Sequence, residues 1–251
     1  MAASLKSPPL SLPEPAAGAA LHLRPTAPLA ERVLLPGDPG RALALAQALL
    51  AEPRMFNHHR GLWGYTGAAG DGEPLTIQAT GMGGPSAAIV LSELIALGAR
   101  RAIRVGTCGA LDASLALGEL LIARESICAD GTSRALGFAE RVAADGALTH
   151  ALEAAAGSTR AGTVMSVDLF YDDLRRSREH GAIAVDMEAA ALFALGSNEK
   201  VPVACVLAVT DTFDAHGART RIEDHLLRDA AEKMGALALR ALGPRGQAGS
   251  S

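Results

Sequence analysis

The chain has 251 residues, of which 49% are hydrophobic, and its formal net charge is −4 at pH 7. A chain of this size can bury one sizeable core, its acidic balance gives no electrostatic basis for binding nucleic acid, and no apolar run is long enough to span a membrane. Its cysteines, Cys108, Cys128 and Cys205, form no Cys-x-x-Cys motif. This favours reduced thiols, a cytoplasmic location and the absence of a zinc site.

Both ends of the chain are predicted to be disordered tails. Residues 1–18 are rich in Pro, Ala and Ser and lack the continuous apolar segment of a signal peptide. Residues 243–251 form the second tail, so we place a single folded domain at residues 19–242. Near the start of this domain His22 lies between apolar residues, where a histidine is usually structural or merely exposed.

Two strand–turn–helix units follow in the first third of the chain. The apolar strand 33–35 leads through a turn containing Gly37 into an Ala/Leu-rich helix at 42–50. Backbone N–H groups at such a helix start, together with the helix dipole, favour an anion, and Arg41 can bind phosphate oxygens in bidentate fashion. The alternative is an ordinary Pro-Gly-Asp turn, and no Walker loop is present. The strand 75–80 begins a second unit of this kind.

Aromatic residues cluster between these two units. Trp63 and Tyr65 lie two residues apart in segment 57–67, which predicts a strand with one packed face. Because aromatic residues make up only 3% of the chain, the pair also indicates a subunit contact. Arg60 stands at the head of this strand.

A third strand–turn unit contains a charge inside an apolar strand. Arg104 lies in the apolar run that begins at residue 102. An unpaired buried charge is very costly, so Arg104 requires a partner. Nothing acidic is nearby in sequence, which leaves a bound anion or a distant Asp or Glu. Gly106 and Gly109, in the turn expected to follow, would let a ligand approach the backbone closely.

The second half of the chain alternates predicted strands with helices and loops. We expect strands at 117–123, 161–166 and 201–209, a polar, flexible connection at 128–132, a charged helix at 172–180, a mobile loop at 215–221 and an amphipathic helix at 225–242. Asp211 follows the last of these strands. It therefore lies at the carboxyl end of a strand, where catalytic groups of α/β sheets are preferentially found.

Two carboxylates, Asp186 and Glu188, flank Met187 where a predicted strand runs into a predicted helix. Residues 182–185 are typical of a strand buried on both faces, and residues 189–195 are typical of a buried helix. The acidic residues could simply begin the helix, where its dipole favours them. Alternatively, they line a cleft in which a carboxylate binds a polyol and the methionine packs against its apolar face.

Five short motifs occur along the chain in the order found in a known family. They are Pro-Gly37-Asp-Pro-x-Arg41, Arg60-Gly-x-x-Gly-Tyr-Thr-Gly, Thr-Gly-Met82-Gly-x-Pro-Ser86, Arg104-Val-Gly-Thr107-x-Gly and Asp-Met187-Glu188-Ala-Ala. Over residues 22–242 the chain resembles the hexameric purine nucleoside phosphorylase and uridine phosphorylase family of the nucleoside phosphorylase-I superfamily. It is most similar to the bacterial purine enzymes.

This resemblance implies an α/β fold, a three-layer α/β/α sandwich with a central mixed β-sheet. It also implies a homo-oligomer, a hexamer built as a trimer of dimers with active sites at the dimer interfaces. The implied reaction is phosphorolysis, in which a purine (deoxy)ribonucleoside and phosphate give the free base and a pentose 1-phosphate. Inorganic phosphate is the co-substrate, and neither a metal nor an organic cofactor is expected.

The resemblance also implies roles for individual residues. Phosphate would be held by Gly37, Arg41, Arg104 and Thr107, with Arg60 contributed by the neighbouring subunit. The nucleoside would be held by His22 of the neighbour at the 5′-hydroxyl, Met82, Phe170 against the base, Asp186, Met187 against the sugar and Glu188 at the ribose hydroxyls.

The implied chemistry is electrostatic, because an oxocarbenium-like ribose forms between phosphate and the departing base. Asp211 would act as the general acid that protonates purine N7. Arg228 is the arginine expected to assist it, and the alternatives are Arg219 and Arg221. Asp186 departs from the family pattern, which has Glu before Met-Glu, and the segment preceding it is shorter than in bacterial purine enzymes. The preferred base therefore stays open.

Three other functions compete with this interpretation. Uridine phosphorylase shares the phosphate and ribose motifs, but uracil has no N7 for Asp211 to protonate. A nucleosidase uses water, so Arg41, Arg60 and Arg104 together would be surplus to it. A non-catalytic nucleoside-binding protein would not need both Glu188 and Asp211.

Overall fold

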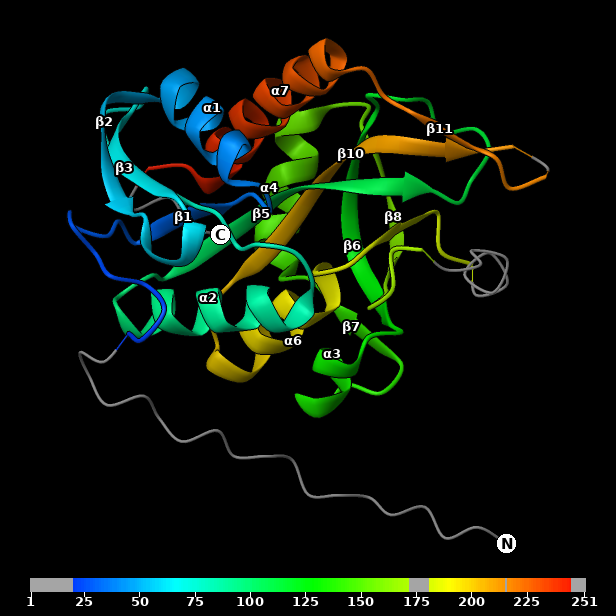
Figure 1. The fold of residues 1–251 in the computed structure, drawn as a ribbon, viewed down its shortest axis with the longest axis horizontal. Helices are drawn as coiled ribbons and strands as arrows, with labels where there is room; N and C mark the ends of the chain where they lie inside the picture. The colour runs from blue at the N-terminus through cyan, green and yellow to red at the C-terminus, as the bar shows by residue number, and fades with distance from the viewer. Residues whose placement is uncertain (1–19, 172–180, 215, 245–251) are drawn as a thin grey trace, which may run out of the picture.

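The computed structural model describes residues 20–171, 181–214 and 216–244. These residues form one mixed sheet with helices on both sides, as the sequence predicts (Figure 1). The strands are β1 (Arg32–Leu35), β2 (Leu50–Asn57), β3 (Gly64–Ala69), β4 (Pro74–Gln78), β5 (Arg101–Ala110), β6 (Leu120–Cys128), β7 (Arg141–Ala143), β8 (Arg160–Ser166), β9 (Ala184–Asp186), β10 (Val203–Phe213) and β11 (Arg219–Arg221). Their order is β11-β10-β6-β8-β9-β5-β1-β4-β3-β2, with β7 beside β6.

The centre of the sheet consists of parallel strands. β1 pairs in parallel with β4 and β5, and β5 pairs in parallel with β10. All four residues of β1 are buried, as expected for a parallel strand covered on both faces. The carboxyl ends of these strands therefore lie along one edge, where α/β sheets bind their ligands.

One part of the sheet closes on itself. β10 also pairs antiparallel with β6, β6 pairs in parallel with β8, β8 pairs in parallel with β9, and β9 pairs antiparallel with β5. The strands β5, β10, β6, β8 and β9 thus form a closed ring beside the open part of the sheet. This closure brings Asp186, at the end of β9, and Glu188, just after it, against β5, which carries Arg104.

The helices cover the sheet in two layers, each with its own apolar core. α1 (Pro39–Leu49), α4 (Gly146–Ala156) and α7 (Asp224–Leu242) contribute Leu45, Leu152 and Met234 to one core. α2 (Gly84–Ala96) and α6 (Ala189–Glu199) contribute Leu91 and Phe193 to the other, and α3 (Gly131–Ala135) packs beside them. In Figure 1, α1 and α7 lie above the sheet, and α2, α3 and α6 lie below it.

Three local predictions are wrong. Gly106 and Gly109 lie within β5 rather than in a turn, because the strand continues to Ala110. The expected connection at 128–132 contains the end of β6 and the start of α3, whose N-terminus is capped by Asp130. Part of the expected loop at 215–221 is β11, which pairs antiparallel with β10.

Some of the sequence predictions fall on parts of the chain that are not described. These are the helix at 172–180, the tail at 1–18 and most of the tail at 243–251. Within the described ranges, no helix combines the length and the apolar character needed to cross a membrane.

Candidate active site

The predicted site residues gather at the carboxyl ends of the central strands. Gly37 follows β1 and Met82 follows β4, and the two loops are joined by a hydrogen bond from the Gly81 N–H to the Gly37 carbonyl (3.0 Å). Thr107 lies on β5 and is half-buried. Met82, by contrast, is 87% exposed. This edge of the sheet is where ligands of α/β folds are expected.

Arg104 is the centre of the site, and its side chain is buried. Its Nε donates to Asp186 Oδ2 (3.2 Å), and its Nη2 donates to Glu188 Oε2. Its Nη1 is buried and has no hydrogen-bond partner in the described part of the chain. Burial acts to lower the pKa of Arg104, but the carboxylates of Glu188 and Asp186 outweigh burial and raise it. Distant acids thus pair with two nitrogens, and the third nitrogen has no partner among the described residues.

Gly106 makes room for this guanidinium. A Cβ atom at position 106 would lie 2.6 Å from Arg104 Cζ, a separation that real side chains do not adopt. The sequence suggested that Gly106 lets a ligand approach the backbone, whereas the neighbour that needs this space is the Arg104 side chain itself. The glycine therefore allows a long charged side chain to lie flat along an apolar strand.

Arg41 brings a second guanidinium towards the same place. Its backbone N–H donates to Asp38 Oδ1 (2.7 Å), which caps the start of α1. Burial lowers the pKa of Arg41, and the positive charge of Arg104 lowers it further, although Asp38 and Glu188 oppose this. Two cationic side chains thus act on each other in a poorly solvated region, an arrangement that an anion would stabilise.

Glu188 links the turn after β4 to the turn after β9. It stands at the N-cap position of α6, and its Oε1 accepts from the Gly83 N–H (2.6 Å) while Oε2 accepts from Arg104. Gly83 has φ +86°, a conformation that glycine adopts far more readily than other residues. Met187 beside it is half-buried. The Asp-Met-Glu motif thus begins a helix and also faces the phosphate-binding candidates.

Asp186 faces into the protein. Its side chain is 0% exposed, and its Oδ1 accepts from Ser166 Oγ (2.6 Å). Its Oδ2 accepts from the Ala189 N–H (2.9 Å) as well as from Arg104. Burial raises the pKa of Asp186 and Glu188 adds to this effect, whereas Arg104 opposes it. The resemblance implies a nucleoside-binding role for Asp186, which stays a prediction; in the described chain its side chain contacts Ser166, Ala189 and Arg104.

Asp211 lies at a β-bulge near the end of β10. The register between β10 and β5 shifts between Val209 and Asp211, and bulges of this kind re-aim side chains next to active sites. Thr210 Oγ1 donates to Asp211 Oδ2 (2.8 Å) and lies 3.2 Å from the Cys108 carbonyl oxygen. The Asp211 side chain is only 6% exposed. A buried carboxyl at this edge suits the predicted role of general acid.

The cations beside Asp211 come from β11. Arg221 Nη1 lies 3.2 Å from Asp211 Oδ1, and Arg219 Nε lies 3.9 Å from it. Arg228, which the sequence placed in this role, is exposed on α7. The two alternatives therefore fit the position beside Asp211 better. The sequence analysis preferred Arg228 because the short, exposed segment Arg219–Arg221 has no alternation of apolar residues that would predict a strand.

An aromatic group lies next to these arginines. The Arg219 guanidinium lies 4.4 Å from the ring centroid of Phe170 and 5.4 Å from that of Phe213. Phe170, predicted to stack on a base, is 42% exposed. The sequence analysis missed Phe213, although its place two residues after Asp211 on the same strand could have indicated it.

Comparisons with known proteins identify the family of the chain. The family described as the phosphorylase superfamily matches residues 31–243. The chain belongs to the phosphorylase superfamily. It is 36% identical over 207 residues to a DeoD-type purine nucleoside phosphorylase of Alkaliphilus metalliredigens (strain QYMF), covering 78% of this chain and 88% of the relative. It is also 36% identical over 195 residues to that of Bacillus thuringiensis (strain Al Hakam), covering 73% and 82%.

Two further predicted residues of this phosphorylase lie apart from the Arg104 cluster. His22 Nδ1 lies 2.7 Å from Glu93 Oε1, and that carboxylate also accepts the backbone N–H groups of residues 21–23. Arg60 is exposed in the short 3₁₀ helix His59–Gly61 and has φ +59°. Such strain in a residue other than glycine is often associated with functional sites. The predicted contacts of both residues with a neighbouring subunit stay predictions.

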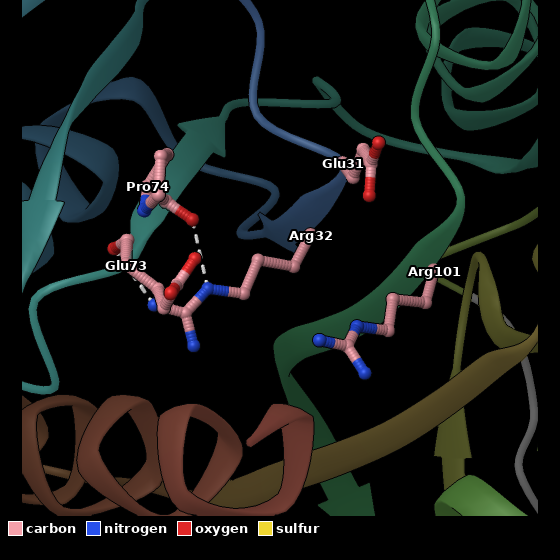
Figure 2. A pocket seen from close by; sticks show the side chains of 5 residues that line it. All are labelled: Glu31, Arg32, Glu73, Pro74 and Arg101. Carbon is pink, nitrogen blue, oxygen red and sulfur yellow. Dashed lines mark hydrogen bonds between the residues drawn. The ribbon is translucent and has the colours of Figure 1, made fainter. Parts of the chain in front are cut away.

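A small cavity lies at the opposite edge of the phosphorylase sheet (Figure 2). Arg32, Pro74 and Arg101, which line it, begin β1, β4 and β5. Arg32 donates to Asp71 (2.5 and 2.6 Å) and to the carbonyl oxygens of Pro74, Glu73 and Gly243. All its N–H groups are thus used within the protein, and this cluster joins the end of α7 to the sheet.

Proposed function

We propose that this protein cleaves the N-glycosidic bond of purine (deoxy)ribonucleosides by phosphorolysis, giving the free base and a pentose 1-phosphate. The observation that carries this proposal is the incomplete set of hydrogen-bond partners around the buried Arg104 guanidinium. Two of its nitrogens are paired with carboxylates, and its buried Nη1 has no partner in the described part of the chain. Inorganic phosphate is an acceptor of the right charge for this nitrogen and for Arg41 nearby. The names of the curated relatives support the same reaction.

The ribose site follows from the phosphate site. Glu188 is paired with Arg104, so a sugar bound at this carboxylate lies next to the bound phosphate. A carboxylate has about four lone-pair sites, and Glu188 can therefore accept from ribose hydroxyls while it keeps Gly83 and Arg104. Phosphate on one face of the sugar stabilises the cationic transition state and then captures C1′.

The base site follows from Asp211 and Phe170. Protonation of N7 by Asp211 makes the purine a better leaving group. Arg221 and Arg219 hold the Asp211 carboxyl in place. The Phe170 ring, which is 42% exposed and has the Arg219 guanidinium over it, would stack on the base with the part that Arg219 leaves open. Asp211 is the residue that distinguishes a purine enzyme from one that acts on uridine, because uracil has no N7 to protonate.

The remaining predictions complete the proposal. Inorganic phosphate is the co-substrate, no metal or organic cofactor takes part, and the enzyme acts in the cytoplasm. The active form is a hexamer, arranged as a trimer of dimers, in which His22 and Arg60 complete the site of a neighbouring subunit. The exposure of Trp63, 40% in the single chain, supports a subunit contact near Arg60.

A nucleoside panel tests this function. Purified protein is incubated with inosine, adenosine and uridine, each with and without inorganic phosphate, and base release is followed. We expect hypoxanthine or adenine to be released only when phosphate is present. Preferred release of uracil would indicate a uridine phosphorylase, and equal release without phosphate would indicate a nucleosidase.

A further inference from the structure

The carboxylate of Asp186 is held from three sides. Ser166 Oγ donates to Oδ1 (2.6 Å), the Ala189 N–H donates to Oδ2 (2.9 Å), and Arg104 Nε donates to the same Oδ2 (3.2 Å). Ser166 is itself fixed, because its Oγ accepts from the Ala190 N–H (2.9 Å). With its side chain 0% exposed, Asp186 is attached to the start of α6 and to β8, and it cannot follow a movement of Arg104.

Glu188, the second partner of Arg104, differs from Asp186. It belongs to the proposed ribose site, so its contacts change when substrate binds. In the proposed site, Nη2 of Arg104 shares its partner Glu188 with the sugar. The partner of Nε is Asp186, whose side chain is fully buried. Since the guanidinium is planar, fixing Nε against Asp186 above Gly106 determines where Nη1 points. The free donor is thus oriented by a buried group that Ser166 and the Ala189 N–H hold in place.

We propose that Asp186 is a positioning residue that fixes Arg104 in its phosphate-binding orientation, and that it does not contact the nucleoside. This inference rests on the proposed phosphorolysis. It also gives a reason for an aspartate at this position. The short side chain reaches Ser166, Ala189 and Arg104 at the same time, and a glutamate would have to place one more methylene group in a site that is already closed.

The test is the Asp186→Asn variant, which keeps the size of the side chain and removes its charge. Without the carboxylate, Arg104 keeps only Glu188 as an anionic partner and turns towards it. We expect the KM for phosphate to rise by about tenfold, the effect of roughly one charge-assisted hydrogen bond. The KM for inosine and the ratio of inosine to 2′-deoxyinosine turnover should stay near their wild-type values.

Asp145→Asn is the matched control. Asp145 caps α4 by accepting the Leu148 N–H (2.8 Å), as Asp186 accepts the N–H three residues ahead, but it is not paired with Arg104. The KM of the Asp145→Asn variant for phosphate should equal that of the wild type. Ser166→Ala is the second variant, because it removes one support of Asp186 and leaves Arg104 and Glu188 intact. We expect a smaller rise in the KM for phosphate than in Asp186→Asn.

Phosphate binding is also measured without nucleoside, as the rise in thermal midpoint on adding inorganic phosphate. Asp186→Asn should need more phosphate than the wild type for the same rise. A higher KM for inosine with unchanged phosphate binding would overturn the inference and assign Asp186 to the nucleoside. An unchanged KM for phosphate in Ser166→Ala would also overturn it, even if Asp186→Asn does not fold. If the wild type neither binds phosphate nor consumes it, the proposed function fails as well.

Discussion

Arg104 occupies a strand whose other buried residues are apolar, and two neighbours make this possible. Gly106 leaves the space that a Cβ atom would fill 2.6 Å from the guanidinium, and Asp186 and Glu188 supply the opposite charge. Removing one partner from a buried charge pair is strongly destabilising. Individual residues here therefore serve stability as well as the proposed phosphate binding, and a test of chemistry alone is better made at Asp211.

Asp211→Asn tests the general acid. Asparagine has nearly the same size but no acidic proton, so we expect turnover of inosine and adenosine to fall by about 10²–10⁴-fold while binding changes little. 7-Methylguanosine already carries a positive charge at N7, and its turnover should survive the substitution. Steady-state kinetics with the three nucleosides measure this. Equal losses for natural and methylated substrates would exclude Asp211 as the acid.

The control for this substitution is Asp214→Asn. Asp214 lies on the same hairpin, and its carboxylate accepts the backbone N–H groups of His216 and Ala218 (2.8 Å each). Near-wild-type turnover in this variant would show that the effect at position 211 does not come from loosening the hairpin.

At the level of elements, strands with continuous apolar runs were predictable and short polar ones were not. The strand expected at 201–209 is observed as β10 (Val203–Phe213), because its continuous apolar run predicts the burial that it has. β11 consists of exposed residues, and only its pairing with β10 makes it a strand. Arg219 and Arg221 were therefore candidates from the sequence, but preferring them to Arg228 required the hairpin that places them beside Asp211.

Asp71 illustrates how the opposite edge of the sheet is held, and it gives a pH-dependent prediction. Hydrogen bonds from Arg32 lower the pKa of Asp71, although burial opposes this. A lowered pKa in the folded state stabilises the protein above the carboxyl's unfolded pKa, and this contribution is lost as the pH falls through the folded value. We expect Asp71→Asn to reduce the free energy of unfolding by about 1 kcal/mol near neutral pH.

Urea denaturation at several pH values measures this contribution. The difference between Asp71→Asn and the wild type should be fully present above the carboxyl's unfolded pKa of about 4 and should shrink as the pH falls below it, through the lowered folded value. Glu73→Gln is the control, since Arg32 contacts the backbone carbonyl of Glu73 and not its carboxylate. A difference that stays constant with pH would show that the charge of Asp71 contributes nothing.

At the level of the whole molecule, the motifs predicted the family, and the fold determined which residues meet. Arg104 and Asp186 are 82 residues apart in the chain, and no local pattern indicates that β9 lies against β5. The sequence left open whether Arg104 has an anion or a distant acid as its partner. The folded chain supplies two acids and still leaves one nitrogen unpaired among the described residues, an outcome that depends on the closed ring of strands.

Subunit mixing tests the proposed assembly. Arg60→Ala and Glu188→Ala subunits are each expected to be inactive, because the first lacks the arginine given to a neighbour and the second lacks its own ribose ligand. Hybrid oligomers contain some sites with both residues intact, so mixing should restore part of the phosphorolytic activity. No recovery, despite subunit exchange demonstrated by mass spectrometry, would show that each site is complete within one chain.

Phosphorus NMR of the reaction products tests the central claim most directly. The wild-type protein is incubated with inosine and inorganic phosphate, and the spectrum is compared with the amount of hypoxanthine released. Phosphorolysis predicts that a pentose 1-phosphate signal grows in equal amount to hypoxanthine while the inorganic phosphate signal declines to match. Release of hypoxanthine together with free ribose, while inorganic phosphate stays constant, would contradict it.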